Sequence, residues 1–345
     1  MPEFKLYTVS DLRNWLMHNN PTEGLSERII APTRAWAIIH NPYVSDDDSV
    51  VAAIFVSHQE VAYTAAFPEI IQGKRIWWFS TLWCNPNYQG CGYGLAVIGS
   101  LAEIYGENCA WDRSGSPETV EIFSLLGNQR IYTPRYVLGD REINVKTLKG
   151  KVASIRQNVL KYLHKKRYRF LEKEYELRYI TYIDDTTYDF IKNHRGEDLF
   201  LHTQEMLNWE LQYPFMTSAP LSQRTAICMD FHSYRDKYRY YAVQVWQYGS
   251  LIGFYILRLL NDKLSVIYCY ADNERTDIVY SSIVEHIHRM NVHMAETDNE
   301  HLAEYIRHHY YFPKAFKRMV SFSPAANVKL PKIIQMQLGD GDCFA

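Results

Sequence analysis

The chain has 345 residues, of which 47% are hydrophobic and 22% are charged, and its formal net charge is −2. This composition is typical of a globular protein, and the length favours two domains over one. A charge this close to zero gives no general attraction to nucleic acid or to anionic lipid.

The N-terminal segment and the cysteines indicate the cellular compartment. The segment "MPEFKLYTVSDLRNW" has neither the basic start nor the apolar core of a signal peptide, and no apolar run approaches the length of a membrane span. The six cysteines include no C-x-x-C pair, so neither a disulfide framework nor a cysteine zinc site is indicated. The sequence therefore predicts a cytoplasmic protein with reduced thiols.

The first elements along the chain alternate between strands and helices. Residues 4–9 are expected to form a strand, and residues 10–18 a helix with Ser10 as its N-cap. A long loop and a helix through residues 34–42 come next. Three strands then follow, at 49–58, 61–68 and 76–84, and the last of them is rich in β-branched and aromatic residues.

A glycine-rich loop follows the last of these strands. Residues 85–94, "NPNYQGCGYG", separate it from a helix predicted at 95–105, which Gly106 ends. Glycine permits φ > 0 and close approach of the backbone. Consecutive N–H groups of such a loop, at the positive end of a helix, can surround an anion such as a pyrophosphate.

Two common phosphate-binding loops do not fit this segment. A G-x-G-x-x-G motif that begins at Gly90 requires glycine where Leu95 stands, and a Walker A loop requires G-K-[ST], which the chain lacks. The remaining pattern is Q-x-x-G-x-G over residues 89–94. It resembles the [RQ]-x-x-G-x-[GA] loop with which the GNAT acetyltransferase superfamily binds the pyrophosphate of acetyl-CoA. The alternative is an ordinary glycine-rich turn between a strand and a helix.

The resemblance implies roles for the strand end and for the loop. Backbone groups around Leu82 and Cys84 are expected to pair with the pantetheine arm and to polarise the acetyl carbonyl. Amides of residues 89–95 are expected to hold the pyrophosphate. The coenzyme-binding residues are thus Leu82, Cys84, Gln89, Gly90, Cys91, Gly92, Tyr93, Gly94 and Leu95, joined by Ser116 and Phe123 of a later helix.

That later helix, predicted after a short strand at 108–114, departs from the GNAT pattern. Many GNAT enzymes carry N-x-x-A-x-x-x-Y-x-x-x-G there, with the tyrosine as general acid toward the coenzyme sulfur. The same spacing here falls on Ser116, Phe123 and Gly127, and phenylalanine cannot donate a proton. Either Tyr132 or water is expected to protonate the thiolate, or catalysis is weak or absent.

Candidates for the general base are carboxylates near the expected acceptor side. Asp112, at the end of a predicted strand, and Glu60, in a hairpin turn, could reach an amine through water, with a solvated surface acid as the alternative for each. The loop 40–48, "HNPYVSDDD", carries three acids that suit a cationic amine, and a capped turn is its alternative. The catalytic candidates are Leu82, Cys84, Asp112, Phe123 and Tyr132.

The second half of the chain repeats the order of the first. A strand at 130–138 is expected to complete the first sheet, and residues 149–173 are predicted to form a linker helix whose basic face is solvated or, alternatively, binds RNA or membrane. Three strands within 241–271 and a helix–strand–helix series through residue 310 follow. The crossing segment "DNERTD" has three acids and no glycine, so no acetyl-CoA site is expected there.

The predicted fold class is α+β or α/β, with two tandem GNAT-like domains, each a mixed central sheet flanked by helices. The expected units are a GNAT domain with the acetyl-CoA loop at 1–143, a linker helix at 144–178, a second GNAT-like domain at 179–330 and a C-terminal tail at 331–345. The spacing of the late histidines does not favour a metal site.

The expected activity is acetyl-CoA-dependent N-acetylation of a small amine, such as an amino sugar. The partners expected are this amine and the co-substrate acetyl-CoA, without nucleic acid or membrane, and the oligomeric state stays open. One alternative is an aminoacyl-tRNA-dependent peptidyl-type transferase built on paired GNAT folds. A non-catalytic acyl-CoA-binding module is the other.

Overall fold

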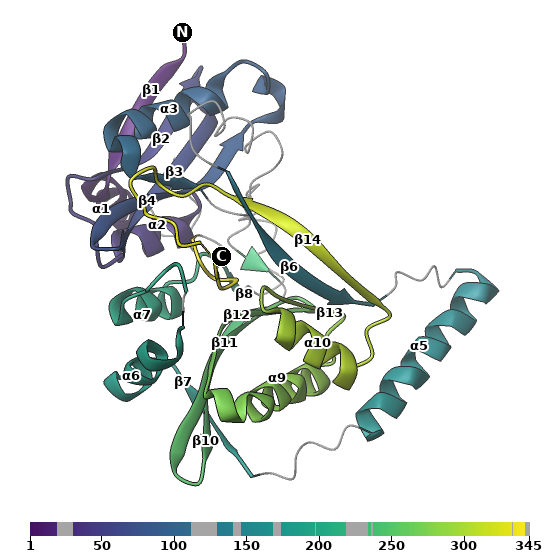
Figure 1. Cartoon of the computed structure of the whole chain (residues 1–345). Coiled ribbons are helices and arrows are strands. Elements are labelled where there is room, and N and C mark those ends of the chain that lie inside the picture. Colours follow the sequence, from purple (N-terminus) through teal and green to yellow (C-terminus); the bar gives the residue numbers. More distant parts are fainter. Residues whose placement is uncertain are drawn as a thin grey trace.

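The chain forms two mixed β-sheets flanked by helices (Figure 1). A computed structural model describes residues 1–18, 30–111, 130–140, 146–167, 174–196, 198–218, 234–235, 237–332 and 334–341. The strands of the first sheet, in spatial order, are β1 (Glu3–Thr8), β2 (Ser49–Val56), β3 (Gln59–Ile71), β4 (Lys74–Cys84) and β5 (Cys109–Trp111). The pairs β1–β2, β2–β3 and β3–β4 are antiparallel, and β5 pairs with β4 in parallel.

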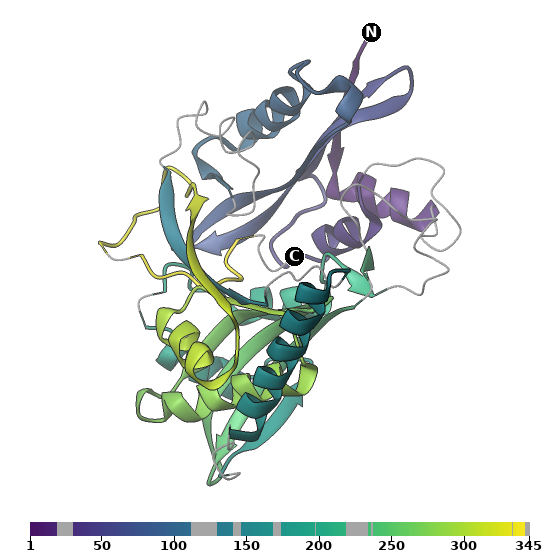
Figure 2. The ribbon, with the colours of Figure 1, turned by 90° about the vertical axis from the view of Figure 1, so that its right-hand side faces the viewer.

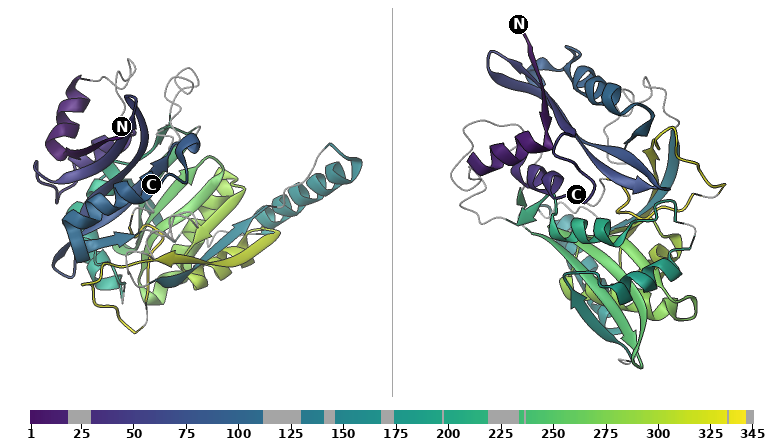
Figure 3. Two further views of the ribbon diagram at one scale, coloured as in Figure 1. Left: turned by 90° about the horizontal axis from the view of Figure 1, so that it is seen from above. Right: turned by 90° about the vertical axis from the view of Figure 1, so that its left-hand side faces the viewer.

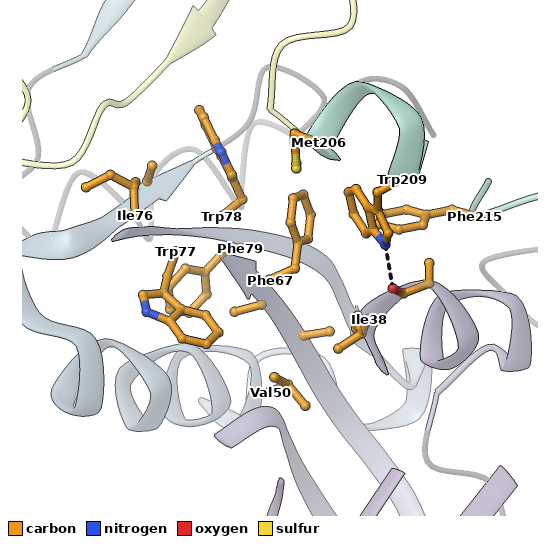
Figure 4. Packing of buried hydrophobic residues seen from close by; sticks show 14 of the residues in the cluster. Ile38, Val50, Phe67, Ile76, Trp77, Trp78, Phe79, Met206, Trp209 and Phe215 are labelled. Carbon is orange, nitrogen blue, oxygen red and sulfur yellow. Dashed lines mark hydrogen bonds between the residues drawn. The ribbon is translucent and has the colours of Figure 1, made fainter. Parts of the chain in front are cut away.

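Among the described residues, three helices accompany the first sheet: α1 (Val9–His18), α2 (Pro32–Ile39) and α3 (Tyr93–Tyr105). Alternation along β4 places neighbouring side chains on opposite faces. Trp77 stacks on Tyr105 of α3, with ring centroids 3.8 Å apart, whereas Trp78 packs against Phe200 and Phe322 from the second half of the chain. Figure 4 shows the two indoles on opposite sides of the sheet. One face is therefore covered by α3 and the other by the second half.

The N-cap expected for α1 is wrong by two positions. The helix begins at Val9, so Ser10 lies within it. Thr8 and Asp11 instead form a reciprocal cap, in which the Thr8 N–H donates to Asp11 Oδ2 at 2.8 Å and the Asp11 N–H donates to Thr8 Oγ1 at 3.2 Å. The acid three residues after the cap makes Thr8 the better choice.

The second sheet contains seven strands in the order β14-β6-β13-β12-β11-β10-β7. Their bounds are β6 (Ile131–Gly139), β7 (Glu176–Ile180), β10 (Tyr238–Gln247), β11 (Ser250–Leu260), β12 (Lys263–Ala271), β13 (Met294–Thr297) and β14 (Lys314–Phe322). The helices of this half are α5 (Leu148–Arg167), α6 (Asp185–His194), α7 (Gln204–Gln212), α9 (Thr276–Met290) and α10 (Glu300–His309). Strands β8 (Thr217–Ser218) and β9 (Tyr234–Arg235) form a separate short pair.

The two halves share one order of elements. In each, four strands pair antiparallel and a helix then leads to a fifth strand parallel to the fourth, with β4, α3 and β5 in the first half and β12, α9 and β13 in the second. The tandem α/β architecture predicted from the sequence is therefore confirmed.

The strand expected to complete the first sheet belongs to the second sheet instead. Strand β6 pairs antiparallel with β14 over its whole length, from Ile131 opposite Phe322 to Gly139 opposite Lys314, and with β13 on its other edge. Figures 1 and 2 show β6 and β14 side by side in both views. Alternation of side chains marks a strand but does not specify its partner, which explains this error.

One buried core spans the contact between the halves. Phe67 of β3 packs against Trp209 of α7, with ring centroids 5.3 Å apart, and the Trp209 indole N–H donates to Ala37 O of α2 at 2.7 Å (Figure 4). Leu338, near the C-terminus, is 1% exposed within the same cluster. The two sheets are therefore held together by a continuous apolar interior.

Candidate acyl-CoA site

The end of β4 carries a β-bulge. The register between β3 and β4 shifts so that Thr81 and Leu82 lie opposite Thr64 alone. Thr81 has φ of +54°, which β-branched residues rarely adopt. The pairing of β4 with β5 ends at Phe79 and Trp111, before the bulge. The bulge therefore changes the direction of the last residues of β4, which lie past the described pairing with β5. Backbone strain of this kind is concentrated at functional sites.

A buried arginine supports the strand at this point. Arg34 of α2 is 7% exposed, donates to Ser80 Oγ at 2.5 Å and lies over the ring of Phe215, 4.5 Å from its centroid. The Thr81 hydroxyl next to Ser80 is buried and has no hydrogen-bond partner among the described residues. The sequence did not indicate a role for Arg34 or for Thr81, because Arg34 lies in a helical pattern and Thr81 lies within an apolar run.

The loop after β4 places two glycines in the left-handed backbone conformation, which other residues rarely adopt. A 3-10 turn, η1 (Pro86–Tyr88), is capped by the Asn85 side chain, which accepts the Asn87 N–H at 3.0 Å. Gly90 and Gly92 follow with φ of +83° and +81°. A side chain at either position would be strained, which agrees with the glycine pattern of the sequence.

The N-terminus of α3 faces solvent, and its first backbone N–H groups have no acceptor within the helix. Gly92 is the N-cap and supplies no side-chain cap. The first helical hydrogen bond is that of the Ala96 N–H to Gly92 O at 3.0 Å, so the N–H groups of residues 93–95 precede the helical ladder. Gly92 is exposed, and Tyr93 and Gly94 are partly exposed. Donors and helix dipole together suit an anion, and these residues therefore fit a pyrophosphate.

The strand end and the loop meet. A Cβ at Gly94 would lie 3.9 Å from both methyl carbons of Leu82, so this part of β4 lies against the first turn of α3. Burial, and to a smaller extent the neighbouring Cys91, raises the pKa of the Cys84 thiol. A protonated thiol is a weak nucleophile, so the Cys84 side chain is not suited to covalent catalysis.

The remaining predicted site residues are not brought to the loop by the described structure. Asp112, Ser116 and Phe123 lie outside the described residues, as does the predicted helix that carries two of them. Tyr132 lies on β6, opposite Ser321 of β14, with its side chain 55% exposed. Its assignment as proton donor stays a prediction.

Two of the three acids of the loop 40–48, Asp46 and Asp48, are engaged within the protein. Asp46 forms an ion pair with Arg13 at 3.0 Å, and Asp48 forms one with Arg75. The Ser45 N–H donates to Asp48 Oδ2 at 2.5 Å, which closes a turn. These contacts favour the capped turn over an amine-binding patch for this loop.

In the second half, the C-terminal segment occupies the place that corresponds to the bulge of β4. The register between β11 and β12 also shifts, which leaves Ile267 of β12 as the extra residue. The Gly339 N–H donates to Ile267 O at 3.0 Å, and the Leu199 N–H donates to Gln335 O at 2.9 Å. Asp272 caps the adjacent 3-10 turn η3 (Asn273–Arg275) by accepting the Glu274 N–H at 3.1 Å. The strand edge here is therefore paired with the protein's own backbone.

Gly339→Ala is expected to lower the free energy of unfolding by about 1–3 kcal/mol, because of overpacking. A Cβ at Gly339 would lie 2.4 Å from Ile267 Cγ2 and 2.6 Å from Tyr268 Cζ. Urea unfolding measures the effect, and limited proteolysis reports release of the C-terminal segment. Gly99→Ala on α3 is the matched control, since it meets open space and removes a helical glycine. Equal stability of the two variants would contradict the close contact.

A buried ionic network lies where the halves meet. His202 is 4% exposed, and its two ring nitrogens face Glu69 Oε1 at 2.5 Å and Asp340 Oδ1 at 2.9 Å. Burial by itself lowers the pKa of His202, but the Glu69 and Asp340 carboxylates hold this pKa well above its usual value. The Trp78 indole N–H also donates to Glu69 Oε2, at 2.7 Å. A charged imidazole thus joins β3, the segment before α7 and the C-terminal segment.

Neither a metal site nor a membrane-spanning helix is found among the described residues. No group of three or more His, Cys, Asp or Glu side chains in these parts of the chain is placed to hold a metal ion. None of the helices in the ranges given above combines the length and the apolar character that crossing a lipid bilayer requires.

The two sheets, with a helix crossing from the fourth to the fifth strand of each, define a tandem GNAT fold. The GCN5-related N-acetyltransferase from Kribbella flavida is similar to this chain with a TM-score of 0.50 and 13% identity, over 94% of this chain and 71% of its own. N-myristoyltransferase from Saccharomyces cerevisiae, solved with bound myristoyl-CoA, is similar with a TM-score of 0.52 and 13% identity, over 93% of this chain and 79% of its own.

Sequence comparisons add no relative. No protein family matches the sequence, and no curated protein matches it either. At 13% identity, the structural similarity establishes the GNAT fold of this chain and leaves its substrates open.

Proposed function

We propose that the chain is an acetyl-CoA-dependent N-acyltransferase with a small amine as acceptor, for instance an amino sugar, working in the cytoplasm. The observation that carries this proposal is the open N-terminus of α3 beside the bulged end of β4. Gly92 supplies no side-chain cap there, and the N–H groups of residues 93–95 precede the helical ladder. A GNAT fold with this loop is suited to an acyl-CoA donor.

In this proposal, each part of the site has one task. The α3 N-terminus and the amides of residues 89–95 bind the pyrophosphate, and backbone groups at Leu82 and Cys84 orient the thioester arm. Acetyl-CoA supplies an activated thioester, whose acetyl group passes to the amine nitrogen while the coenzyme leaves as a thiol. The acceptor must be neutral to attack, and Asp112 or Glu60 is proposed to take its proton. Tyr132 or water returns one to the leaving thiolate.

The second half is proposed to hold no donor. The backbone of β12 at Ile267 already pairs with Gly339, and in place of glycines the turn before α9 carries Asp272 and Glu274, with Asp277 in the first turn of α9. Negative side chains would repel a pyrophosphate, and the Gly339 N–H already occupies the Ile267 carbonyl at the edge of β12. Only the first half therefore keeps both features of the site.

Isothermal titration with acetyl-CoA is expected to give one equivalent per chain. A second titration with myristoyl-CoA tests the acyl length, because the similar yeast protein was solved with that donor. Thiol release over a panel of amines then identifies the acceptor class. Two equivalents would contradict the assignment of the second half, and an absence of binding would contradict the proposed function.

The two alternative functions predict different results in the acetyl-CoA titration and the thiol-release assay. A non-catalytic acyl-CoA-binding module would bind the donor without releasing thiol in the presence of any amine. A peptidyl-type transferase that uses aminoacyl-tRNA would transfer an aminoacyl group and would not require acetyl-CoA.

A further inference from the structure

Helix α5 presents an apolar stripe to solvent at the edge of the molecule. Five residues along it follow one another at alternate spacings of four and three, and all are exposed: Leu148 80%, Val152 59%, Ile155 63%, Val159 49% and Tyr162 57%. Figures 1 and 3 show α5 projecting beyond the second sheet. A regular 4–3 spacing places these side chains in a single seam along the helix.

The opposite side of α5 faces the protein. Gly150 is buried, and Ser154, Gln157, Lys161 and His164 are partly buried. Lys161 pairs with Asp140 at 2.5 Å, and its Nζ lies 5.8 Å from the ring centroid of Tyr310. This inward face is polar or small apart from the partly buried Leu160, and the five stripe residues are turned outward. This orientation is the reverse of that of an ordinary surface helix and marks an interaction surface.

Basic residues border the stripe on both sides. Lys151 precedes Val152, Lys149 follows Leu148 and Arg156 follows Ile155, while Lys165 precedes the next heptad position, and all four bases are exposed. Residues 148–167 contain seven lysines and arginines and no acidic residue. In heptad terms these four bases occupy the g and e positions, which select the partner by charge.

We infer that α5 docks an acidic amphipathic helix of another protein, one with an apolar heptad seam and Glu or Asp at its flanking positions. A second copy of this chain is disfavoured, because its bases would face bases in either orientation. An anionic membrane is the main competing occupant, because interfacial helices bury Trp, Phe or Leu beside Lys and Arg, and the stripe contains Leu148 but neither Trp nor Phe. RNA would use the bases and leave the apolar seam uncovered.

The test uses two synthetic peptides of four heptads with Ile at a and Leu at d, one with Glu and the other with Lys at e and g. Fluorescence anisotropy with the full chain is expected to show binding of the Glu peptide, weakened by NaCl, and none of the Lys peptide. The variant Ile155→Ser should weaken binding at least about tenfold. Ala153→Ser, also on α5 and outside the stripe, should not.

A charge reversal sharpens the test. Reversal of all four flanking bases, Lys149→Glu, Lys151→Glu, Arg156→Glu and Lys165→Glu, should exchange the preference, so that the Lys peptide binds and the Glu peptide does not. Equal binding of both peptides, or an unchanged preference after reversal, would overturn the inference. So would tighter binding to phosphatidylserine vesicles than to the Glu peptide, or a dimer in sedimentation that Ile155→Ser dissociates. None of these measurements depends on the acyl donor.

Discussion

Gly92→Asp is expected to weaken acetyl-CoA binding by at least about 100-fold. The substitution places a carboxylate at the N-cap of α3, where the proposed pyrophosphate lies against the N–H groups of residues 93–95. Two unit charges 4 Å apart near a protein surface repel by about 4 kcal/mol, and each 1.4 kcal/mol changes an affinity tenfold. Isothermal titration of the purified variant measures the loss.

The matched control for Gly92→Asp is Gly73→Asp in the turn between β3 and β4. Gly73 has φ of +75°, and a Cβ at Gly73 would meet open space, as it would at Gly92, so the two changes impose similar backbone strain and the same charge. Only the change at Gly92 should affect binding, and both variants should unfold at similar urea concentrations. Unchanged affinity in Gly92→Asp would mean that the loop is structural.

His202→Leu is expected to lower the free energy of unfolding by about 3–5 kcal/mol, as removal of one partner from a buried ion pair does. The leucine would leave Glu69 and Asp340, 1% and 2% exposed, as uncompensated carboxylates in the junction between the halves. Urea unfolding measures this loss. His18→Leu, at the exposed end of α1, is the control and should change stability by no more than about 0.5 kcal/mol.

The pH dependence of stability separates the charge of His202 from its packing. The folded state raises the pKa of His202 well above 6.5, and burial, together with Asp340, raises that of nearby Asp198 from 3.8 to about 7. The folded protein therefore binds more protons than the unfolded chain, and its stability falls as pH rises. Asp198 contributes to this fall between pH 3.8 and about pH 7, and His202 contributes above pH 6.5. Urea unfolding of the native protein at several pH values above 7 measures this decline. Stability that stays constant as pH rises above 7 would contradict a charged His202.

Local sequence determined most of the described elements and the conformation of the glycine-rich loop after β4. Gly106 ends α3 with φ of +55°, and Tyr248 and Gly249 turn the chain between β10 and β11 with φ of +50° and +80°. Gly90 and Gly92 take the positive φ that the motif implied. These features depend on backbone dihedral preferences and on the period of burial, which neighbouring residues encode.

The tertiary structure decided which segments meet. It paired β6 with β13 and β14, turned the C-terminal segment against Ile267, and brought Glu69 and Asp340 to His202 across sequence separations of 133 and 138 residues. The β-branched Thr81 was forced to φ of +54° by its place in the sheet. A strand or an ionisable residue carries no local mark of its partner, because that choice depends on packing and desolvation summed over the whole core.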